Sequence, residues 1–419
     1  MDHHPSYLSG HKRDLFVLVV AAVAVRVIWL WLGSWTANDS ADYLAIGANL
    51  LDHGSFSLSD GGTSPTAFRP PLFPFVIAFI WVLAGKSVTA ILIGNIIFGS
   101  ATVGLTYLIA HRSFDRMTAL LAAGALAVAP MTALFAVTPL TESLFTFLAV
   151  LAIFLWGEKK YVLAGSIFGL AALARPTIIP FFALITLLPI LPPWRPLWRT
   201  HLVMVLAALG VVGIWTVRNV TVLDRFALVS SAGIGVNLLC GTLETDTGGN
   251  VWNGSEWGPL DLKTNPVTRV DGVSDEFEVD KIRRDRALSR IITEPGQWMV
   301  ARLKQFPKLF VDNGDYLLGT ANLPLRQAFS NGVWGVAAFK LAFITVNLLI
   351  FALAIFGFWR MGPQIVLSTH IWMFPLFGVL IHLPMWIEPR YFLPMMPMVF
   401  IMAAYATSTI LSKSSVLNK

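Results

Sequence analysis

The stretch YVLAGSIFGLAALARPTIIPFFALITLLPIL (residues 161–191) decides how this chain is threaded through a membrane. As a single helix it would be about 46 Å long, whereas the hydrocarbon core of a bilayer is roughly 30 Å thick. The segment LARPT (173–177) interrupts the apolar run near its middle. We therefore predict two short spans, near 161–174 and 177–191, in place of one long helix.

Basic residues in the short loops support this prediction, because cytoplasmic loops of membrane proteins are enriched in Lys and Arg. With two spans, all the short basic loops fall on the side of the N-terminal HKR (11–13). These loops are HRSFDR (111–116), GEKK (157–160), WRPLWR (194–199), WR (359–360) and the C-terminal SKSSVLNK (412–419). With one span, these loops would not all fall on the same side of the membrane. We expect both termini to be cytoplasmic and three polar regions to lie outside: 34–87, a corner near 137–141, and 218–334.

Composition is that of a polytopic membrane protein. Of 419 residues, 56% are hydrophobic and 13% are charged, and the mean hydropathy is +0.68, unlike a soluble domain. The net charge of +6 does not predict nucleic-acid binding, because many basic residues lie in the orienting loops. The single cysteine, Cys240, cannot form an internal disulfide.

We predict an all-α protein with one membrane-embedded domain over 1–419. Its ten spans are expected near 15–33, 88–110, 117–136, 140–156, 161–174, 177–191, 201–217, 335–358, 364–384 and 391–412.

The first outer region opens with NDSADYLAIGANLLDHGSF (38–56), which is helix-like but too polar to re-enter lipid. Asp39 and Tyr43 are four residues apart, so on a helix they share a face. Two interpretations of Asp39 stay open from spacing alone. It either caps the helix from a surface loop, or it is a general base held just outside the bilayer.

Other charged residues map to the same outer side. Arg69, at the edge of the apolar FRPPLFPFVIAFIWVLAG (68–85), is either a phosphate ligand or a snorkelling arginine. Glu142 begins a span, where it either helps to start the helix or has a function. Arg175 lies at the break in 161–191, where exposed backbone usually lines protein or water.

Two further groups of residues lie where predicted spans end at the outer membrane surface. They are Arg218 and Asn219, and then Glu388, Arg390 and Tyr391. Singly, such residues are ordinary interface anchors. Together with the acids above, outer-face arginines suit a reaction on an anionic lipid phosphate. The chain has no phosphate-binding loop, dinucleotide fingerprint or nucleophile elbow, so we expect no nucleotide or organic cofactor.

Six segments, in order, resemble the dolichyl-phosphate-mannose-protein mannosyltransferase superfamily, whose bacterial branch includes polyprenyl-phosphate-sugar transferases and lipid A aminoarabinose transferases. They are DSADYLAIGANLL, RPPLFPFVIAF, TESLFTFLAVLAIF, GLAALARPT, WTVRNVTVLDRFALVSSAGIGVNLLCG and EPRYFLPMMP. The resemblance covers about residues 15–410. It implies a C-type glycosyltransferase fold, a helical bundle of about ten or more spans with extracytoplasmic loop helices. The bundle would sit in the plasma (inner) membrane.

The resemblance also implies the activity and the roles of residues. Asp39 would be the catalytic acid, with Tyr43 four residues on; Arg69 would lie near the lipid phosphate, and Glu142 would be the second acid. Arg390 and Tyr391 match a late basic and aromatic motif. A hexosyl or pentosyl group would move, with inversion, from a polyprenyl-phosphate donor to a hydroxyl of a lipid, glycan or protein. Some relatives bind a divalent metal ion, for which the sequence assigns no ligands.

Two alternatives to this function stay open. A transporter or flippase would carry polar sites near mid-membrane, and Arg26, Lys340 and His370 do lie well inside predicted spans. A lipid-linked polysaccharide polymerase or ligase also uses outer-face arginines, but does not depend on one acid in the first outer loop.

Overall fold

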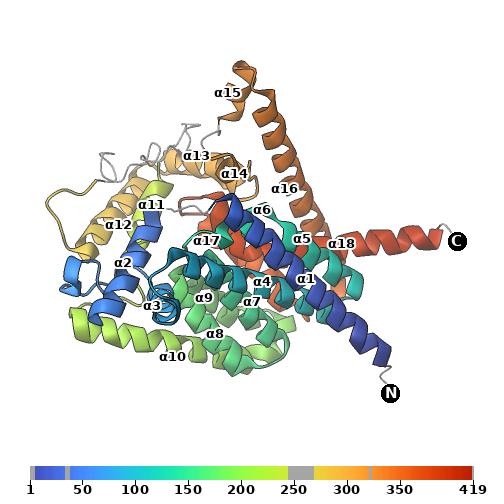
Figure 1. The fold of residues 1–419 in the computed structure, drawn as a ribbon, viewed down its shortest axis with the longest axis horizontal. Coiled ribbons are helices and arrows are strands. Elements are labelled where there is room, and N and C mark those ends of the chain that lie inside the picture. The colour runs from blue at the N-terminus through green and yellow to red at the C-terminus, as the bar shows by residue number, and fades with distance from the viewer. Residues whose placement is uncertain (1–4, 34–37, 244–268, 320–322, 418–419) are drawn as a thin grey trace. The chain divides into compact units, whose positions relative to one another are not determined.

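The structure is a computed structural model that describes residues 5–33, 38–243, 269–319 and 323–417 (Figure 1). Within these ranges the regular elements are helices, and the only β feature is an isolated bridge between Ser57 and Pro65. The all-α prediction is therefore confirmed. Parts of the predicted outer regions, 34–37 and 244–268, lie outside the described residues.

The α-helices alternate with short 3₁₀ turns along the chain. Those of the first half are α1 Pro5–Leu32, α2 Asn38–His53, α3 Leu72–Ala84, α4 Val88–Ser113, α5 Arg116–Val128, α6 Pro130–Ala136, α7 Glu142–Gly157, α8 Tyr161–Ala174, α9 Ile179–Leu187 and α10 Trp198–Leu223. Those of the second half are α11 Ile234–Gly241, α12 Glu276–Thr293, α13 Pro295–Gln305, α14 Asp315–Leu318, α15 Leu325–Ser330, α16 Trp334–Arg360, α17 Thr369–His382 and α18 Met396–Leu417.

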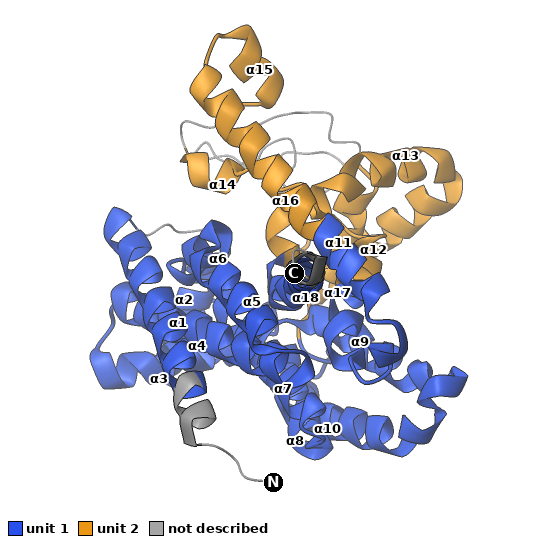
Figure 2. Ribbon diagram, turned by 90° about the vertical axis from the view of Figure 1, so that its right-hand side faces the viewer, with its two compact units in different colours: residues 1–229, 352–377, 393–419 blue, residues 230–351, 378–392 orange. Residues whose placement is uncertain are grey.

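The chain divides into two compact units, coloured separately in Figure 2. Unit 1 comprises residues 1–229, 352–377 and 393–419, and unit 2 comprises residues 230–351 and 378–392. The single membrane-embedded domain over 1–419 stays a prediction.

Among the described residues, five stretches are long and apolar enough to cross a membrane. They are His11–Leu32, Val88–Ser113, Pro192–Leu223, Trp334–Arg360 and Pro389–Ser412. The α5 and α6 pair, bent by 55°, makes a sixth if it is one span. The other four predicted spans correspond to shorter apolar helices, namely α7, α8, Pro176–Ile190 and α17. The protein is a polytopic membrane protein, and the count of ten spans stays a prediction.

The predicted break inside 161–191 is present. Helix α8 ends at Ala174, Arg175 is extended with φ −145° and ψ 108°, and a 3₁₀ turn, Pro176–Ile178, leads into α9. Proline has no N–H to continue a helix, and it disfavours the helical conformation in the residue before it. Pro176 therefore accounts for both the end of α8 and the extended backbone of Arg175.

Two glycines allow α8 and α10 to pack closely. A Cβ added at Gly165 would lie 2.0 Å from the Met204 carbonyl oxygen, and one at Gly169 would lie 2.7 Å from that of Ala208. Both clashes are with backbone atoms, which a rotamer change cannot relieve. Because Arg175 follows α8 directly, this contact also fixes the position from which its side chain starts.

Helices α2 and α3 also pack against each other, and they hold the loop between them. A Cβ at Gly47 would lie 2.5 Å from Cγ2 of Ile77, so the helices meet at this glycine. The Asn49 amide donates to the carbonyls of Ser57 (2.9 Å) and Ser59 (3.0 Å). The loop that carries Arg69 is therefore tied to α2.

We expect Gly165→Ala to destabilise unit 1 by about 1–3 kcal/mol, as overpacked cores generally do. The matched control is Gly210→Ala on α10, where an added Cβ meets nothing within 4 Å. Thermal unfolding in detergent measures both effects. Equal unfolding temperatures for the two variants would contradict the close approach of α8 and α10.

Candidate functional site

Arg69 is shared by two carboxylates at the start of α2. Its Nη2 donates to Oδ1 of Asp39 at 2.8 Å and to Oδ2 of Asp42 at 2.7 Å, and its Nε donates to the same Asp42 oxygen at 3.0 Å. Asp39 and Asp42 are three residues apart, so they lie on one face of the helix. The Asp39 side chain keeps 25% of its surface exposed, which leaves room for a substrate group to reach it.

Tyr43 lies beneath this ion-pair network and is 6% exposed. The Arg69 guanidinium carbon lies 5.4 Å from the centre of the Tyr43 ring, and the Phe73 ring meets Tyr43 edge-on at 5.5 Å. Burial raises the pKa of Tyr43 to about 12, and the charges of Asp39 and Glu142 act in the same direction. The phenol is therefore neutral at physiological pH and can serve as a hydrogen-bond donor.

Burial alone would lower the pKa of Arg69, but the neighbouring Asp39 carboxylate, Tyr43 and the Asp42 carboxylate raise it above the ordinary value. The guanidinium thus carries a permanent positive charge in the site. A carboxylate paired with such a cation is favoured in its ionised form.

Glu142 and Arg175 make a second ion pair in unit 1. Arg175 Nη1 lies 2.9 Å from Glu142 Oε1, and the two side chains are 19% and 5% exposed respectively. Glu142 is the first residue of α7, and Arg175 stands at the break after α8. Tyr43 interacts electrostatically with both members of this pair and with Asp39 and Arg69. The structure thereby brings five of the predicted site residues together: Asp39, Tyr43, Arg69, Glu142 and Arg175.

Arg218 and Asn219 hold the chain around this site. Arg218 Nη1 donates to the carbonyl of Thr66 at 2.9 Å, three residues before Arg69. Its guanidinium carbon lies 4.7 Å from the Trp215 ring centre. The Asn219 amide donates to the carbonyls of Ala227 (3.0 Å) and Val229 (3.2 Å). These contacts anchor two loops to α10, so the direct substrate binding predicted for both residues stays a prediction.

The remaining predicted residues form a cluster within unit 2. Glu388 Oε2 accepts from Arg390 Nε at 2.6 Å and from the Tyr316 hydroxyl at 2.9 Å. The Arg390 guanidinium carbon lies 5.4 Å from the centre of the Tyr391 ring. Burial raises the pKa of Tyr316, and the Glu388 charge adds to this effect. Glu388 and Arg390 are each 8% exposed at the side chain, so this pair is desolvated.

Sequence reasoning missed two members of these clusters. Asp42 could have been found, because it lies three residues after Asp39 and so shares its helix face. Tyr316 had no local signal, since its partner Glu388 is 72 residues away. Among the described residues, no group of three or more His, Cys, Asp or Glu side chains could hold a metal ion.

Residues 68–218 match the family model described as dolichyl-phosphate-mannose-protein mannosyltransferase. This segment contains Arg69, Glu142, Arg175 and Arg218, whereas Asp39 and Glu388 lie outside it. The predicted resemblance to this family is confirmed for the matched segment. No curated protein sequence matches the chain.

The fold resembles that of an archaeal oligosaccharyltransferase, AglB from Archaeoglobus fulgidus. Its complex with an inhibitory peptide and a dolichol-phosphate matches with a TM-score of 0.55 at 12% identity, covering 99% of this chain and 52% of that one. The form tethered to an acceptor peptide through a disulfide matches with a TM-score of 0.55 at 12% identity, covering 96% of this chain and 50% of that one. The complex with Zn and sulfate matches with a TM-score of 0.53 at 13% identity, covering 96% of this chain and 49% of that one.

At these identities the likeness shows the fold alone, and the chain spans about half the length of the protein it resembles. The C-type glycosyltransferase fold predicted from the sequence is confirmed.

The Glu142 and Arg175 pair provides a stability test. We expect Arg175→Met to cost about 3–5 kcal/mol, because it leaves the buried Glu142 carboxylate without its counter-charge. Adding Glu142→Gln should restore most of that loss. The control is Arg112→Met, which breaks a more exposed pair with Glu158 and should cost about 0–1 kcal/mol. A double-variant cycle of unfolding temperatures checks this, and strictly additive losses at Glu142 and Arg175 would contradict the coupling.

Proposed function

We propose that this chain is a glycosyltransferase that uses a polyprenyl-phosphate-linked sugar as donor and an acceptor hydroxyl as nucleophile. The observation that carries this proposal is the arrangement of Asp39, Asp42 and Arg69 beside the Glu142 and Arg175 pair. It lies in a fold shared with an oligosaccharyltransferase solved with dolichol-phosphate. The segment matching the mannosyltransferase family supports the same proposal.

Asp39 is proposed as the general base. It lies in the first turn of α2, partly exposed, and its orientation is fixed by Arg69. The acceptor hydroxyl gives its proton to Asp39 as its oxygen forms a bond to the anomeric carbon of the donor. The bond from that carbon to the phosphate oxygen breaks at the same time. Because the acceptor attacks opposite the leaving phosphate, the anomeric configuration is inverted.

The departing polyprenyl phosphate gains negative charge and needs positive charge near it. In unit 1, Arg69 provides the guanidinium closest to Asp39. Glu142 and Arg175 are proposed to bind substrate beside Tyr43, whose neutral hydroxyl can donate to a sugar oxygen. Arg218 and Asn219 in unit 1, and Glu388, Arg390 and Tyr391 in unit 2, remain proposed substrate-binding residues.

A divalent metal ion is kept in the proposal because a structural relative was solved with Zn. Asp39 and Asp42 are the residues that would hold it. Two carboxylates fit the partial donor set that Mg²⁺ or Mn²⁺ takes when water and phosphate oxygens complete its coordination. When bound, such an ion would supply Lewis-acid stabilisation to the phosphate.

The donor's prenyl chain is proposed to lie in membrane lipid against the apolar helices. The acceptor is a lipid, a glycan or a protein, and the sugar is a hexosyl or pentosyl group. From the loop charges, the active site faces the extracytoplasmic side of the plasma membrane, with both termini cytoplasmic.

We expect Asp39→Asn to lower transfer by about 10²–10⁴-fold, because it removes the general base and keeps the size of the side chain. Unused lipid-phosphate sugar should accumulate in cells. The matched control is Asp52→Asn, which removes an acid from the far end of α2, where it pairs with Lys86, and should leave transfer unchanged. Mass spectrometry of prenyl-phosphate lipids and envelope glycans gives the readout, and normal transfer by Asp39→Asn would refute the assignment.

The topology has its own test. A reporter inserted after residue 225, just beyond the end of α10, should be extracytoplasmic. A second reporter after residue 159, in the basic loop between α7 and α8, should be cytoplasmic. If both reporters fall on one side, the two-span arrangement of 161–191 is wrong, and the proposed outer face of the site falls with it.

A further inference from the structure

Arg26 carries a charge in the middle of an apolar helix. It belongs to the candidate span His11–Leu32 and is 1% exposed, one of the largest fully buried side chains of the described chain. A buried ionised side chain in a membrane span is costly unless something compensates its charge. None of the ion pairs within the described ranges includes Arg26.

The hydrogen bonds of Arg26 leave part of its guanidinium unsatisfied. Nη1 donates to the carbonyls of Ala22 at 3.0 Å and Ala127 at 3.4 Å. Nε is buried and has no hydrogen-bond partner among the described residues. Both bonds go to neutral acceptors, so they satisfy N–H groups without balancing the positive charge.

Gly99 on α4 makes room for this group. A Cβ at Gly99 would lie 2.8 Å from Arg26 Nε, closer than real carbon contacts allow. The absence of a side chain there lets the guanidinium lie against the helix backbone. The position of the charge is therefore built into the packing of α1 on α4.

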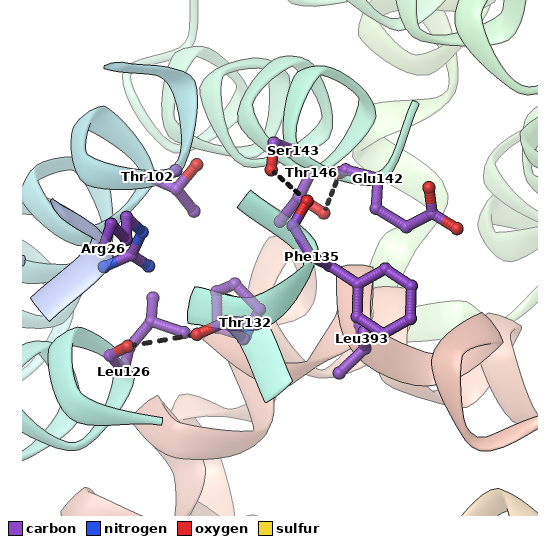
Figure 3. A pocket seen from close by; sticks show the side chains of 11 residues that line it. Arg26, Thr102, Leu126, Thr132, Phe135, Glu142, Ser143, Thr146 and Leu393 are labelled. Atoms are coloured by element: carbon purple, nitrogen blue, oxygen red, sulfur yellow. Dashed lines mark hydrogen bonds between the residues drawn. The ribbon is translucent and has the colours of Figure 1, made fainter. Parts of the chain in front are cut away.

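A small cavity of about 30 Å³ adjoins the guanidinium. Since one water-sized particle needs about 10–15 Å³ of cavity volume, the cavity has room for about two or three. Hydroxyl side chains share its lining with Arg26 (Figure 3): Thr102, Thr132, Ser143 and Thr146.

Each of these hydroxyls now bonds a backbone carbonyl, as in Thr102 to Phe98 (2.9 Å) and Thr146 to Glu142 (2.7 Å). A hydroxyl hydrogen rotates to suit its surroundings. The carbonyls of Phe98 and Glu142 lie within helices and already accept backbone bonds, so Thr102 and Thr146 can turn toward the cavity at little cost. The lining therefore offers one charged donor and several adaptable ones.

The start of α7 also favours negative charge in this cavity. Ser143 lies in the first turn of this 16-residue helix, where unpaired backbone N–H groups carry a partial positive charge. Glu142 lines the cavity too, but its carboxylate pairs with Arg175. Figure 3 shows that carboxylate pointing away from Arg26.

We propose that this cavity binds a single monatomic anion of the size of chloride, held by Arg26 and the surrounding hydroxyls. Water would satisfy Arg26 Nε but would leave a net charge in an apolar bundle, whereas a halide ion neutralises it. The small volume favours a monatomic anion over a phosphate or a lipid headgroup. This cavity shares Glu142 in its lining with the proposed transfer site, but the anion proposal does not depend on that function.

The first test uses the full-length protein in detergent without any substrate. Its unfolding temperature is measured while sodium chloride replaces sodium gluconate at constant ionic strength. A ligand that binds only the folded state stabilises it in a saturable way, so we expect the unfolding temperature to rise to a plateau. An equal unfolding temperature in both salts would mean that water alone fills the cavity, and would overturn the proposal.

Variants identify the site. Arg26→Met should abolish the chloride dependence, whatever it does to stability in gluconate. If that variant does not fold, Thr102→Val keeps the charge, removes one hydroxyl and should raise the half-saturating chloride concentration several-fold. Arg199→Met, which removes an exposed guanidinium at the start of α10, is the matched control and should keep the wild-type dependence. Unchanged half-saturation in Thr102→Val would contradict the assignment to this cavity.

Bromide provides a direct view, because its anomalous scattering distinguishes it from water. Crystals grown in sodium bromide should show an anomalous peak beside Arg26 Nε. No peak there at saturating bromide would overturn the proposal. Sugar transfer is not measured in any of these experiments, so their outcome leaves the proposed function untouched.

Discussion

The Arg69 guanidinium, bonded to both Asp39 and Asp42, is the interaction on which the rest of the candidate site depends. It joins the first turn of α2 to the loop that leads into α3. Without it, two carboxylates on one helix face would repel each other and turn toward solvent. With it, Asp39 is fixed in direction yet remains partly exposed. Tyr43 is covered in turn, because the guanidinium lies over its ring.

The second ion pair follows from the backbone break after α8. Pro176 ends the helix and forces Arg175 into an extended conformation, which releases its side chain toward the start of α7. Glu142 lies there as the first residue of α7. The close contacts at Gly165 and Gly169 fix the position of α8 against α10. Arg175, which follows α8 directly, lies 2.9 Å from Glu142.

Local rules in the sequence were enough to predict several of these features. The break in 161–191 follows from bilayer thickness and one proline, and the shared face of Asp39 and Tyr43 follows from helix periodicity. The sequence could not predict which side chains bond to each other across the tertiary fold. The place of Arg69 near a lipid phosphate stays a prediction. Its bonds to Asp39 and Asp42 arise because the loop between α2 and α3 folds back onto α2 through Asn49. Tyr316 and Glu388 meet only through the tertiary fold.

Charge balance in the site bears on how a donor would bind. Glu142 and Arg175 form one ion pair, whereas Asp39, Asp42 and Arg69 together carry one net negative charge. That net charge suits the proposed general base, since negative charge nearby favours proton uptake by a carboxylate. It opposes a phosphate, however, because like charges at short range repel. Arg69 alone cannot offset both carboxylates and a donor phosphate. Either a further guanidinium would have to approach, or a divalent cation held by Asp39 and Asp42 would have to supply the missing positive charge. The same net charge therefore gives a physical reason to include a metal ion in the mechanism proposed with Asp39 as the base.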